Sequence, residues 1–591
     1  MKKILAMVLA VVLLLGITAC TPQDNSAEKI APPTLKYLYN TSDAHKAIAE
    51  YIQSAFATVG VTMTLENQEW NTFLNTRKNG EYGVARNGWV ADYNDPICFL
   101  DMWTSNSGNN DVQFGKGAHK DLAMYSVDLT PYGGEKIENK TWAETYDVLI
   151  AKIKATTKAE DRYALMHIAE DMLMATGCIT PIYYYTDLYM IDDKVEGFYS
   201  NPLGYKYFMY TTVDGKTDKL NVCLASEPDT LDPALNSAVD GATMLVQMFS
   251  GLAKWTYVDG KFVIAPDCAK ELVEGVVNED GTVTYTYTLR DGLKWSNGDE
   301  LKASDFVNAW KRAASTELGA DYGYMFEVVK GYGTDNKDDL AVVADDAAKT
   351  ITVTLSNAVA YWNELLAFPT YFPVHSSAYA SEKWATEPAT YICNGAYKMD
   401  AWTHDSVITL KKNANYHDAA SVKMEELNCY LSDDANNMLT NFKKGDWLFI
   451  DDVPTNEIAS LKTEYADEFV IAGQIGTYYV CWNINQDLLP GSTLSAVEKE
   501  KAQQEIRKAF GLILDRNHIV ANVSQAGEVP ASSFVAMGMT EADGSEFYKN
   551  ANKAAGATYV GYYDTSADAF SGNVAKAVET LQKYYNITVA E

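Results

Sequence analysis

The carboxylates and thiols of this chain are the side chains whose chemistry has to be considered first. Asp92 and Asp95 stand close enough in sequence to form, in principle, the carboxylate pair of a general acid–base catalyst. In a chain with a formal net charge of −31, neighbouring acidic residues are usually a solvated surface. The sequence also has no Gly-x-Ser-x-Gly, no His-Glu-x-x-His, no phosphate loop and no EF-hand spacing. It therefore predicts a protein that is not an enzyme.

The cysteines show no spacing that is typical of a metal or redox site. There is no Cys-x-x-Cys and no pairing of cysteine with histidine, so we expect no metal and no cofactor. Besides Cys20 the chain has seven cysteines: Cys98, Cys178, Cys223, Cys268, Cys393, Cys429 and Cys481. We interpret these seven as small buried hydrophobic residues, and the sequence leaves open which of them pair.

The first 32 residues have the pattern of a targeting segment rather than of folded structure. Lys2 and Lys3 precede an apolar run that is too short for an ordinary membrane span. The run ends in Ile-Thr-Ala-Cys20, which resembles a lipobox, so we expect a lipoprotein signal peptide over 1–20, a lipid on Cys20 and a tether over 21–32. A plain secretory signal with a chance cysteine is the alternative. The expected location is the extracytoplasmic face of the cell membrane, with the protein held by lipid.

Composition limits the remaining classes of function. The 591 residues correspond to about four units of ordinary domain size, and 47% hydrophobic residues exclude a disordered chain. The negative charge argues against nucleic acid and against a polybasic membrane patch. It could steer cationic ligands, but a solvated surface is the simpler interpretation, because the charge is spread along the chain.

Several segments have clear helix, strand or turn patterns. Residues 40–58 predict an amphipathic helix that Asn40, Thr41 or Ser42 could cap, and residues 141–174 predict a longer one. Asp214 and Gly215 predict a turn. Residues 282–295, TVTYTYTLRDGLKW, predict a β-hairpin arm. The alternation of strands and helices indicates an α/β fold.

Longer motifs carry a family resemblance. The segments LRDGLKWSNGDELKASDFVNAWKRA, NGAYKMDAWTHDS and IRKAFGLILDRNHIV resemble the large solute-binding family that includes oligopeptide, dipeptide and nickel receptors. The segments NTSDAHK, NQEWNTFLNTRKNG and VARNGWVADYNDP resemble its oligopeptide branch. This resemblance implies a two-lobed, periplasmic-binding-protein-like α/β fold of the large class, with an extra subdomain.

The order of the resembling segments is reversed. The segment 35–212 resembles the C-terminal third of an oligopeptide-binding protein, and the segment 219–590 resembles its N-terminal two thirds. We therefore expect a circularly permuted binding protein. Its expected parts are the second half of lobe two (33–187), the first part of lobe one (188–263), the extra subdomain (264–378), the second part of lobe one (379–474) and the first half of lobe two (475–591).

The resemblance also implies which residues bind a ligand. A receptor for many peptides can rely only on what all peptides share, namely a backbone, an ammonium and a carboxylate. Asp92 matches the partner of the ligand ammonium, and Trp89 and Trp70 match aromatic residues of the ligand pockets. The residues that match positions meeting ligand carboxylates are Arg77, Arg86 and His45. Core or surface roles are the alternatives for each of these residues.

Four further positions follow from the same resemblance. Glu227 matches a cleft glutamate, with a turn-capping carboxylate as the alternative. Tyr478 and Tyr479 match the crossing between the lobes, with the apolar core as the alternative. Ser524 stands where some relatives carry a lysine, which leaves the preferred ligand length open.

The resemblance thus implies a monomeric receptor that captures short peptides and delivers them to the permease of an ABC importer. A non-peptide solute receptor of the same family, or a peptide-signal sensor without transport, are the alternatives.

Overall fold

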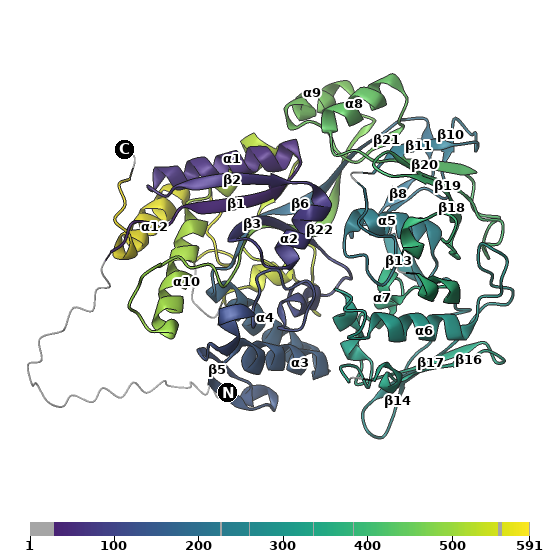
Figure 1. Ribbon diagram of the computed structural model, residues 1–591, viewed down its shortest axis with the longest axis horizontal. Coiled ribbons are helices and arrows are strands. Elements are labelled where there is room, and N and C mark those ends of the chain that lie inside the picture. The colour runs from purple at the N-terminus through teal and green to yellow at the C-terminus, as the bar shows by residue number, and fades with distance from the viewer. Residues whose placement is uncertain are drawn as a thin grey trace, which may run out of the picture.

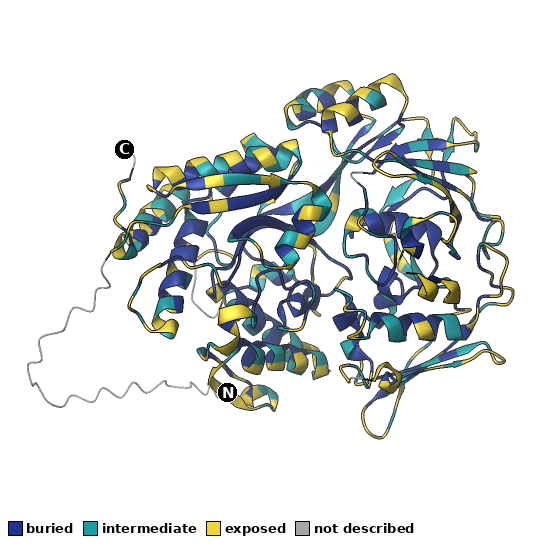
Figure 2. Ribbon diagram, viewed as in Figure 1, coloured by how far each residue is buried: buried dark blue, intermediate teal, exposed yellow. Residues whose placement is uncertain are grey.

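The computed structural model describes residues 29–224, 227–258, 261–334, 336–381, 383–553 and 558–589. These residues form an α/β structure of two lobes, which lie on the left and right of Figure 1 and are joined by long central strands. Buried residues concentrate on the central strands, and exposed residues lie on the outer faces of the helices (Figure 2). The expected α/β, two-lobed fold is confirmed. Cys20 lies outside the described residues.

One large mixed sheet runs through both lobes. Its strands, in spatial order, are β18 (Tyr397–Thr403), β19 (Val407–Lys412), β20 (Glu426–Tyr430), β11 (Leu220–Cys223), β21 (Phe449–Ile450), β6 (Ile179–Ile191), β22 (Phe469–Trp482), β3 (Val84–Val90), β1 (Leu35–Asn40) and β2 (Met63–Gln68), with β23 (Val529–Pro530) beside β6.

The two longest strands connect the lobes. β6 and β22 pair antiparallel over most of their length, with a break in register between Gly473 and Thr477 of β22. On one side of this break β22 pairs with β3, and on the other side β6 pairs with β21. A register break in a strand pair disrupts the ladder and bends the strand, so this point is suited to a hinge.

The helices cover the sheet and the outer rim of both lobes. They are α1 (Asp43–Thr58), α2 (Trp70–Lys78), α3 (Val148–Ala155), α4 (Ala159–Ala175), α5 (Val239–Met248), α6 (Ala303–Ala313), α7 (Trp362–Leu365), α8 (Ala435–Lys444), α9 (Ile458–Glu464), α10 (Ala496–Leu512), α11 (Arg516–His518) and α12 (Phe570–Tyr584).

The helix predictions are confirmed in part. Ser42, one of the three expected caps, accepts a hydrogen bond from the His45 amide and begins α1. The single helix expected over residues 141–174 is wrong, because α3 ends at Ala155 and α4 begins at Ala159. The two helices pack against each other, so the apolar spacing is satisfied by a helical pair rather than by one long helix.

Small sheets complete the structure. One of them joins β14 (Val276–Val277), β15 (Val283–Thr288), β17 (Thr350–Leu355) and β16 (Val342–Asp345). Four pairs are separate from it: β12 (Ala253–Val258) with β13 (Lys261–Pro266), β4 (Tyr125–Asp128) with β5 (Lys136–Lys140), β7 (Val195–Glu196) with β10 (Thr212–Val213), and β8 (Tyr199–Ser200) with β9 (Lys206–Tyr207).

The expected hairpin over residues 282–295 is wrong. β15 pairs with β14 and β17 instead of folding back on residues 293–295. The apolar side of β15 explains the choice, because Val283 faces Leu355 and Tyr287 faces Ile351 in the register with β17. After the strand, the chain leaves the sheet, and the Arg290 amide donates to the Cys268 carbonyl.

The predicted turn at Asp214 and Gly215 is confirmed. Both residues have positive φ, at 50° and 71°, and Val213 and Lys216 exchange two backbone hydrogen bonds of 2.9 Å. This is the geometry of a two-residue hairpin of type I′, for which Asp-Gly is a favoured pair.

The chain segments at the two ends of the described residues lie beside one another. The Ile30 amide donates to the Tyr584 carbonyl at 3.1 Å, and the Asn586 amide donates to the Ile30 carbonyl at 2.8 Å. Figure 1 shows β1 in purple and α12 in yellow on the same lobe. In that lobe Phe56 of α1 lies 4.7 Å from Phe510 of α10, measured between ring centroids.

The cysteines behave as small apolar residues. The seven that lie in the described ranges are all buried, and no disulfide joins any two of them. In the described part of the chain, no helix combines the length and apolar character that a membrane span requires.

Candidate functional site

A cavity of about 480 Å³ lies between the two lobes. It is lined from one side by α1, α2 and β3 and from the other by α5 and the loops after β11 and β21. Six residues predicted for the site line it: Asp92, Trp89, Arg86, Arg77, His45 and Trp70. The structure thus brings together side chains that extend over 48 positions of the sequence.

Asp92 is a buried carboxylate without a cation. It follows the end of β3 and is 7% exposed. Its Oδ1 accepts a hydrogen bond from the Tyr322 hydroxyl at 2.9 Å, and Cys98 Sγ lies 3.6 Å from Oδ2. Burial raises the pKa of Asp92 to about 8, against the smaller opposing effect of the Tyr322 hydrogen bond. A ligand cation would relieve this cost.

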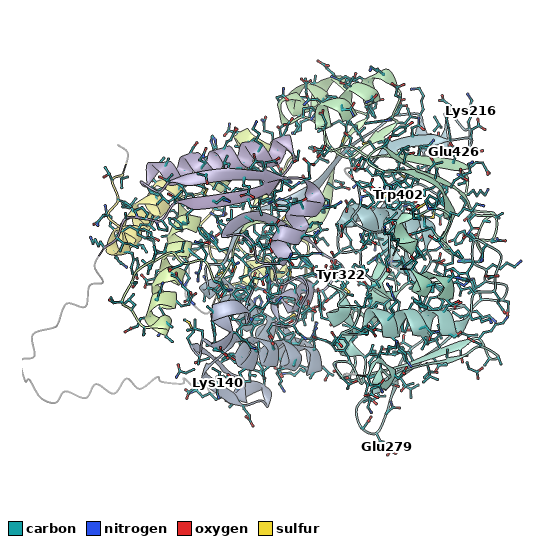
Figure 3. The ribbon with its side chains drawn as sticks, in the orientation of Figure 1. Lys140, Lys216, Glu279, Tyr322, Trp402 and Glu426 are labelled. Carbon is teal, nitrogen blue, oxygen red and sulfur yellow. The ribbon has the colours of Figure 1, made fainter. Side chains whose placement is uncertain are left out.

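Tyr322 is a residue of the site that the sequence did not predict. It belongs to the other lobe, and Figure 3 shows it between the two halves of the molecule. Its hydroxyl is the hydrogen-bond donor that orients Asp92, and its ring lies 6.3 Å from that of Trp89. The two residues Asp92 and Tyr322 are 230 positions apart, so no local pattern could have indicated the contact.

Arg86 is the buried cation of the cavity. Its Nη2 lies 2.9 Å from His45 Nε2, its guanidinium lies 5.4 Å from the centre of the Tyr478 ring, and its Nε is buried without a partner. Burial, followed by the charge of Arg86, lowers the pKa of His45 well below its usual value, so His45 is a neutral acceptor. Arg86 therefore has no acidic counter-charge among the described residues.

Arg77 is placed differently. Its Nε donates to Asp111 Oδ2 at 2.7 Å, in a pair whose side chains are 8% and 6% exposed. Asn87 donates to the same oxygen at 3.0 Å. Only Nη1 of Arg77 is buried without a partner, so its charge is already neutralised and it is less available to a ligand carboxylate than Arg86.

The two predicted tryptophans form part of the apolar lining. Trp89 lines the cavity and donates its indole N–H to the Cys98 carbonyl at 3.0 Å. Trp70 stacks on Phe73 at 6.0 Å and lies 5.9 Å below the Arg86 guanidinium. Aromatic rings arranged in this way accept varied apolar groups while supporting a neighbouring cation.

Three predicted residues do not line the cavity. Tyr478 and Tyr479 are fully buried on β22, and Tyr478 stacks on Tyr183 at 4.8 Å behind the lining. Glu227 accepts from the Asp405 amide at 3.0 Å and lies 2.6 Å from His404, so it holds the loop between β18 and β19. Ser524, by contrast, is part of the cavity lining.

Polar contacts cross from one lobe to the other around the cavity. Lys78 of α2 donates to the Ser237 hydroxyl at 2.6 Å and forms an ion pair with Asp321. The Asn94 amide donates to Glu364 Oε2 at 2.6 Å. These contacts join the two lobes.

The fold and the cavity define the class of the protein: a two-lobed binding protein with a cavity at the junction of the lobes. The chain matches the family model of the bacterial extracellular solute-binding proteins, family 5 Middle, over residues 20–111 and 264–584, and it belongs to this family.

Individual relatives agree with this membership. The chain is 35% identical over 338 residues to the oligopeptide-binding protein OppA of Bacillus subtilis, covering 54% of this chain and 57% of that protein. It is 32% identical over 312 residues to the dipeptide-binding protein DppE of the same organism, covering 51% of each. The chain thus spans about half the length of the curated relatives it matches. It is also similar to the solved OppA of Burkholderia pseudomallei, with a TM-score of 0.48 and 23% identity over 62% of this chain and 67% of that one.

The buried carboxyls predict a pH dependence of stability. Burial raises the pKa of Asp92 and of Glu170 to about 8 and that of Glu364 to about 7. Near neutral pH the folded chain holds protons that the unfolded chain has already released, so stability falls as pH rises. The slope is roughly 1.4 kcal/mol per pH unit for each carboxyl that remains protonated.

The buried histidines have lowered pKa values, so they oppose this loss only up to about the usual histidine pKa of 6.5, and their effect fades above it. We expect chemical denaturation to give a smaller free energy of unfolding at pH 8 than at pH 6.5. The Asp92→Asn variant should show a shallower slope. An equal or greater stability at pH 8 would contradict the assignment of these carboxyls as protonated.

Proposed function

We propose that the protein captures short peptides outside the cytoplasmic membrane and delivers them to the permease of an ABC importer. One observation carries this proposal: a single cavity contains a buried carboxyl group, Asp92, and a buried guanidinium, Arg86, and neither has a counter-charge among the described residues. Unpaired buried charges are costly. A ligand ammonium would let Asp92 ionise and pair with it, and a ligand carboxylate would pair with Arg86.

The positions of the two charges suit a short peptide. Arg86 lies within β3 and Asp92 lies two residues after its end. Six residues of extended chain span about 20 Å at roughly 3.3 Å per residue. An extended peptide of a few residues covers a gap of up to this length, so it could reach from one group to the other.

The names of the relatives support the same class of ligand. Those cited above are called oligopeptide- and dipeptide-binding, and another at 25% identity is called a murein peptide-binding protein, MppA of Escherichia coli. One relative, YgiS of Escherichia coli, is named as a probable deoxycholate-binding protein, so the family name alone does not settle the solute.

Native mass spectrometry of the purified protein tests the proposal. We expect bound peptides of a few residues, which dissociate on unfolding. Calorimetry with synthetic peptides should then show that acetylating the amino end or amidating the carboxyl end each weakens binding. A protein that co-purifies with a non-peptide solute, and binds no peptide, would contradict the proposal.

We also propose that a lipid on Cys20 holds the protein at the membrane. The support is the lipobox-like sequence before Cys20, which lies outside the described residues. Replacing Cys20 with alanine should move the protein from the membrane fraction to the soluble fraction while its peptide affinity stays unchanged. Retention of the Cys20→Ala variant in washed membranes would refute the anchor.

Finally, we propose that the chain is circularly permuted, with the part boundaries given in the sequence analysis. The adjacent ends at Ile30 and Asn586 and the tight Val213–Lys216 turn support this proposal. The proposed boundary at Asp187 lies beside Ala472 on the paired strands, next to the register break of β22.

A reordered variant tests the permutation. A chain that starts at Thr217, joins residue 590 to Pro33 and ends at Thr212 should fold with similar stability and bind the same peptides. Failure of this reordered chain to fold, under conditions in which the original chain folds, would count against the permutation.

A further inference from the structure

The cavity contains one more buried carboxylate, which the ends of a peptide would leave without a partner. Glu528 lines the cavity from the loop before β23 and is 8% exposed. Its Oε2 is buried and has no hydrogen-bond partner among the described residues. Burial is the main cause that raises its pKa, and the Ser524 hydroxyl and two backbone amides oppose the rise.

The surroundings of Glu528 are aromatic. Tyr183 and Tyr185 on β6 also line the cavity, with their rings 5.6 Å apart and nearly perpendicular. Glu528 lies beside these residues, because the next residue, Val529, pairs with Tyr184 of β6, and its charge contributes to the raised pKa of both phenols. A carboxylate beside aromatic faces is a combination that binds ammonium and guanidinium groups.

No cation of the described residues forms an ion pair with Glu528. Lys206 is held between Asp187 and Asp451, at 3.0 Å from each. The charge of Lys462 lowers the pKa of Glu528, but it is the smallest of the five effects on that pKa. The Lys462 ammonium itself donates to the Gln525 carbonyl at 3.2 Å.

Several other acids of the lining have partners, since Asp111 pairs with Arg77 and Asp187 pairs with Lys206. Asp240 accepts a hydrogen bond from the Gly241 amide at 2.8 Å, and Asp452 accepts one from the Val453 amide at 2.7 Å. A dipolar peptide would use Asp92 for its ammonium and Arg86 for its carboxylate. Glu528 would then remain as an acid with an unsatisfied oxygen inside the closed cavity, unless the ligand supplies a second cation.

We propose that Glu528, Tyr183 and Tyr185 form a subsite for a cationic side chain, which selects short peptides containing lysine or arginine. This inference rests on the proposed peptide-binding function and specifies its substrate class. The carboxylate supplies the charge, and the two tyrosine rings enclose the aliphatic stem of the side chain.

Calorimetry with matched peptides tests the subsite. The set consists of alanine tri- and tetrapeptides in which lysine, or Nε-acetyl-lysine, replaces each alanine in turn. At one position we expect the lysine peptide to bind the wild-type protein at least tenfold more tightly than its acetylated counterpart. In Glu528→Gln this ratio should fall to about one, while the affinity for the all-alanine peptide stays unchanged.

Glu464→Gln is the matched control, because it removes one exposed carboxylate of α9 that does not line the cavity. It should keep the wild-type ratio. If the wild-type protein bound the lysine and acetyl-lysine peptides with equal affinity at every peptide position, the subsite would be overturned without need of a variant. A Glu528→Gln variant that retains the tenfold ratio would also overturn it. If no peptide binds at all, the proposed function itself fails, and the subsite fails with it.

Discussion

Replacing Asp92 with asparagine is expected to weaken the binding of peptides with a free amino end by about 2–5 kcal/mol, the usual loss for a buried charge pair. Asparagine keeps the shape of the side chain but cannot ionise beside the ligand ammonium. Asp92 is 7% exposed and has no cation beside it among the described residues. No neighbouring group would therefore replace the carboxylate charge that the substitution removes. Titration calorimetry of the wild type and the variant measures the difference.

The same experiment has a second readout that a purely structural role would not change. Because burial raises the pKa of Asp92 to about 8, the free protein holds this proton at pH 7 and loses it when an ammonium binds. Calorimetry in buffers of different ionisation enthalpy should show proton release for the wild type and none for Asp92→Asn. N-acetylated peptides are the control, since they bring no ammonium. Equal losses for free and acetylated peptides would contradict the assignment.

Replacing Arg507 with methionine is expected to lower the free energy of unfolding by about 3–5 kcal/mol, because it leaves a buried acid without its partner. Arg507 on α10 is fully buried and pairs with Glu500. Its Nε also donates to the Thr176 carbonyl at 3.0 Å, which links α10 to the chain between α4 and β6. Urea denaturation followed by fluorescence measures the loss.

The double replacement Glu500→Leu with Arg507→Met shows how much of this loss comes from leaving Glu500 unpaired. Removing both charges leaves no unpaired charge, although the Thr176 carbonyl and the Gln503 amide each lose a hydrogen bond, so the double variant should recover a large part of the lost stability. Peptide affinity should stay unchanged in either variant, since neither residue lines the cavity. A loss below about 1 kcal/mol in Arg507→Met would mean that water or another group compensates Glu500.

Local sequence was sufficient for much of the fold. Ser42 could be found as a candidate cap because helix caps depend on residues a few positions apart. The Asp214–Gly215 turn could be found because positive φ at both positions strongly favours this pair. The hairpin error at residues 282–295 has the opposite cause: β15 pairs with β17, which lies more than 60 positions along the chain, and strand partners at that distance leave no local pattern.

The sequence by itself determined the family and the α/β class. It also determined the motif that places Arg86 and Trp89 on one strand and Asp92 just beyond it. These properties depend on residues that are neighbours in the chain. Only the tertiary structure decided which charges remain unpaired. It neutralises Arg77 with Asp111, turns Glu227 toward His404 and leaves Oε2 of Glu528 without a hydrogen-bond partner among the described residues. Burial and counter-charge are properties of groups that meet in space, and the residues that supply them here come from distant parts of the chain.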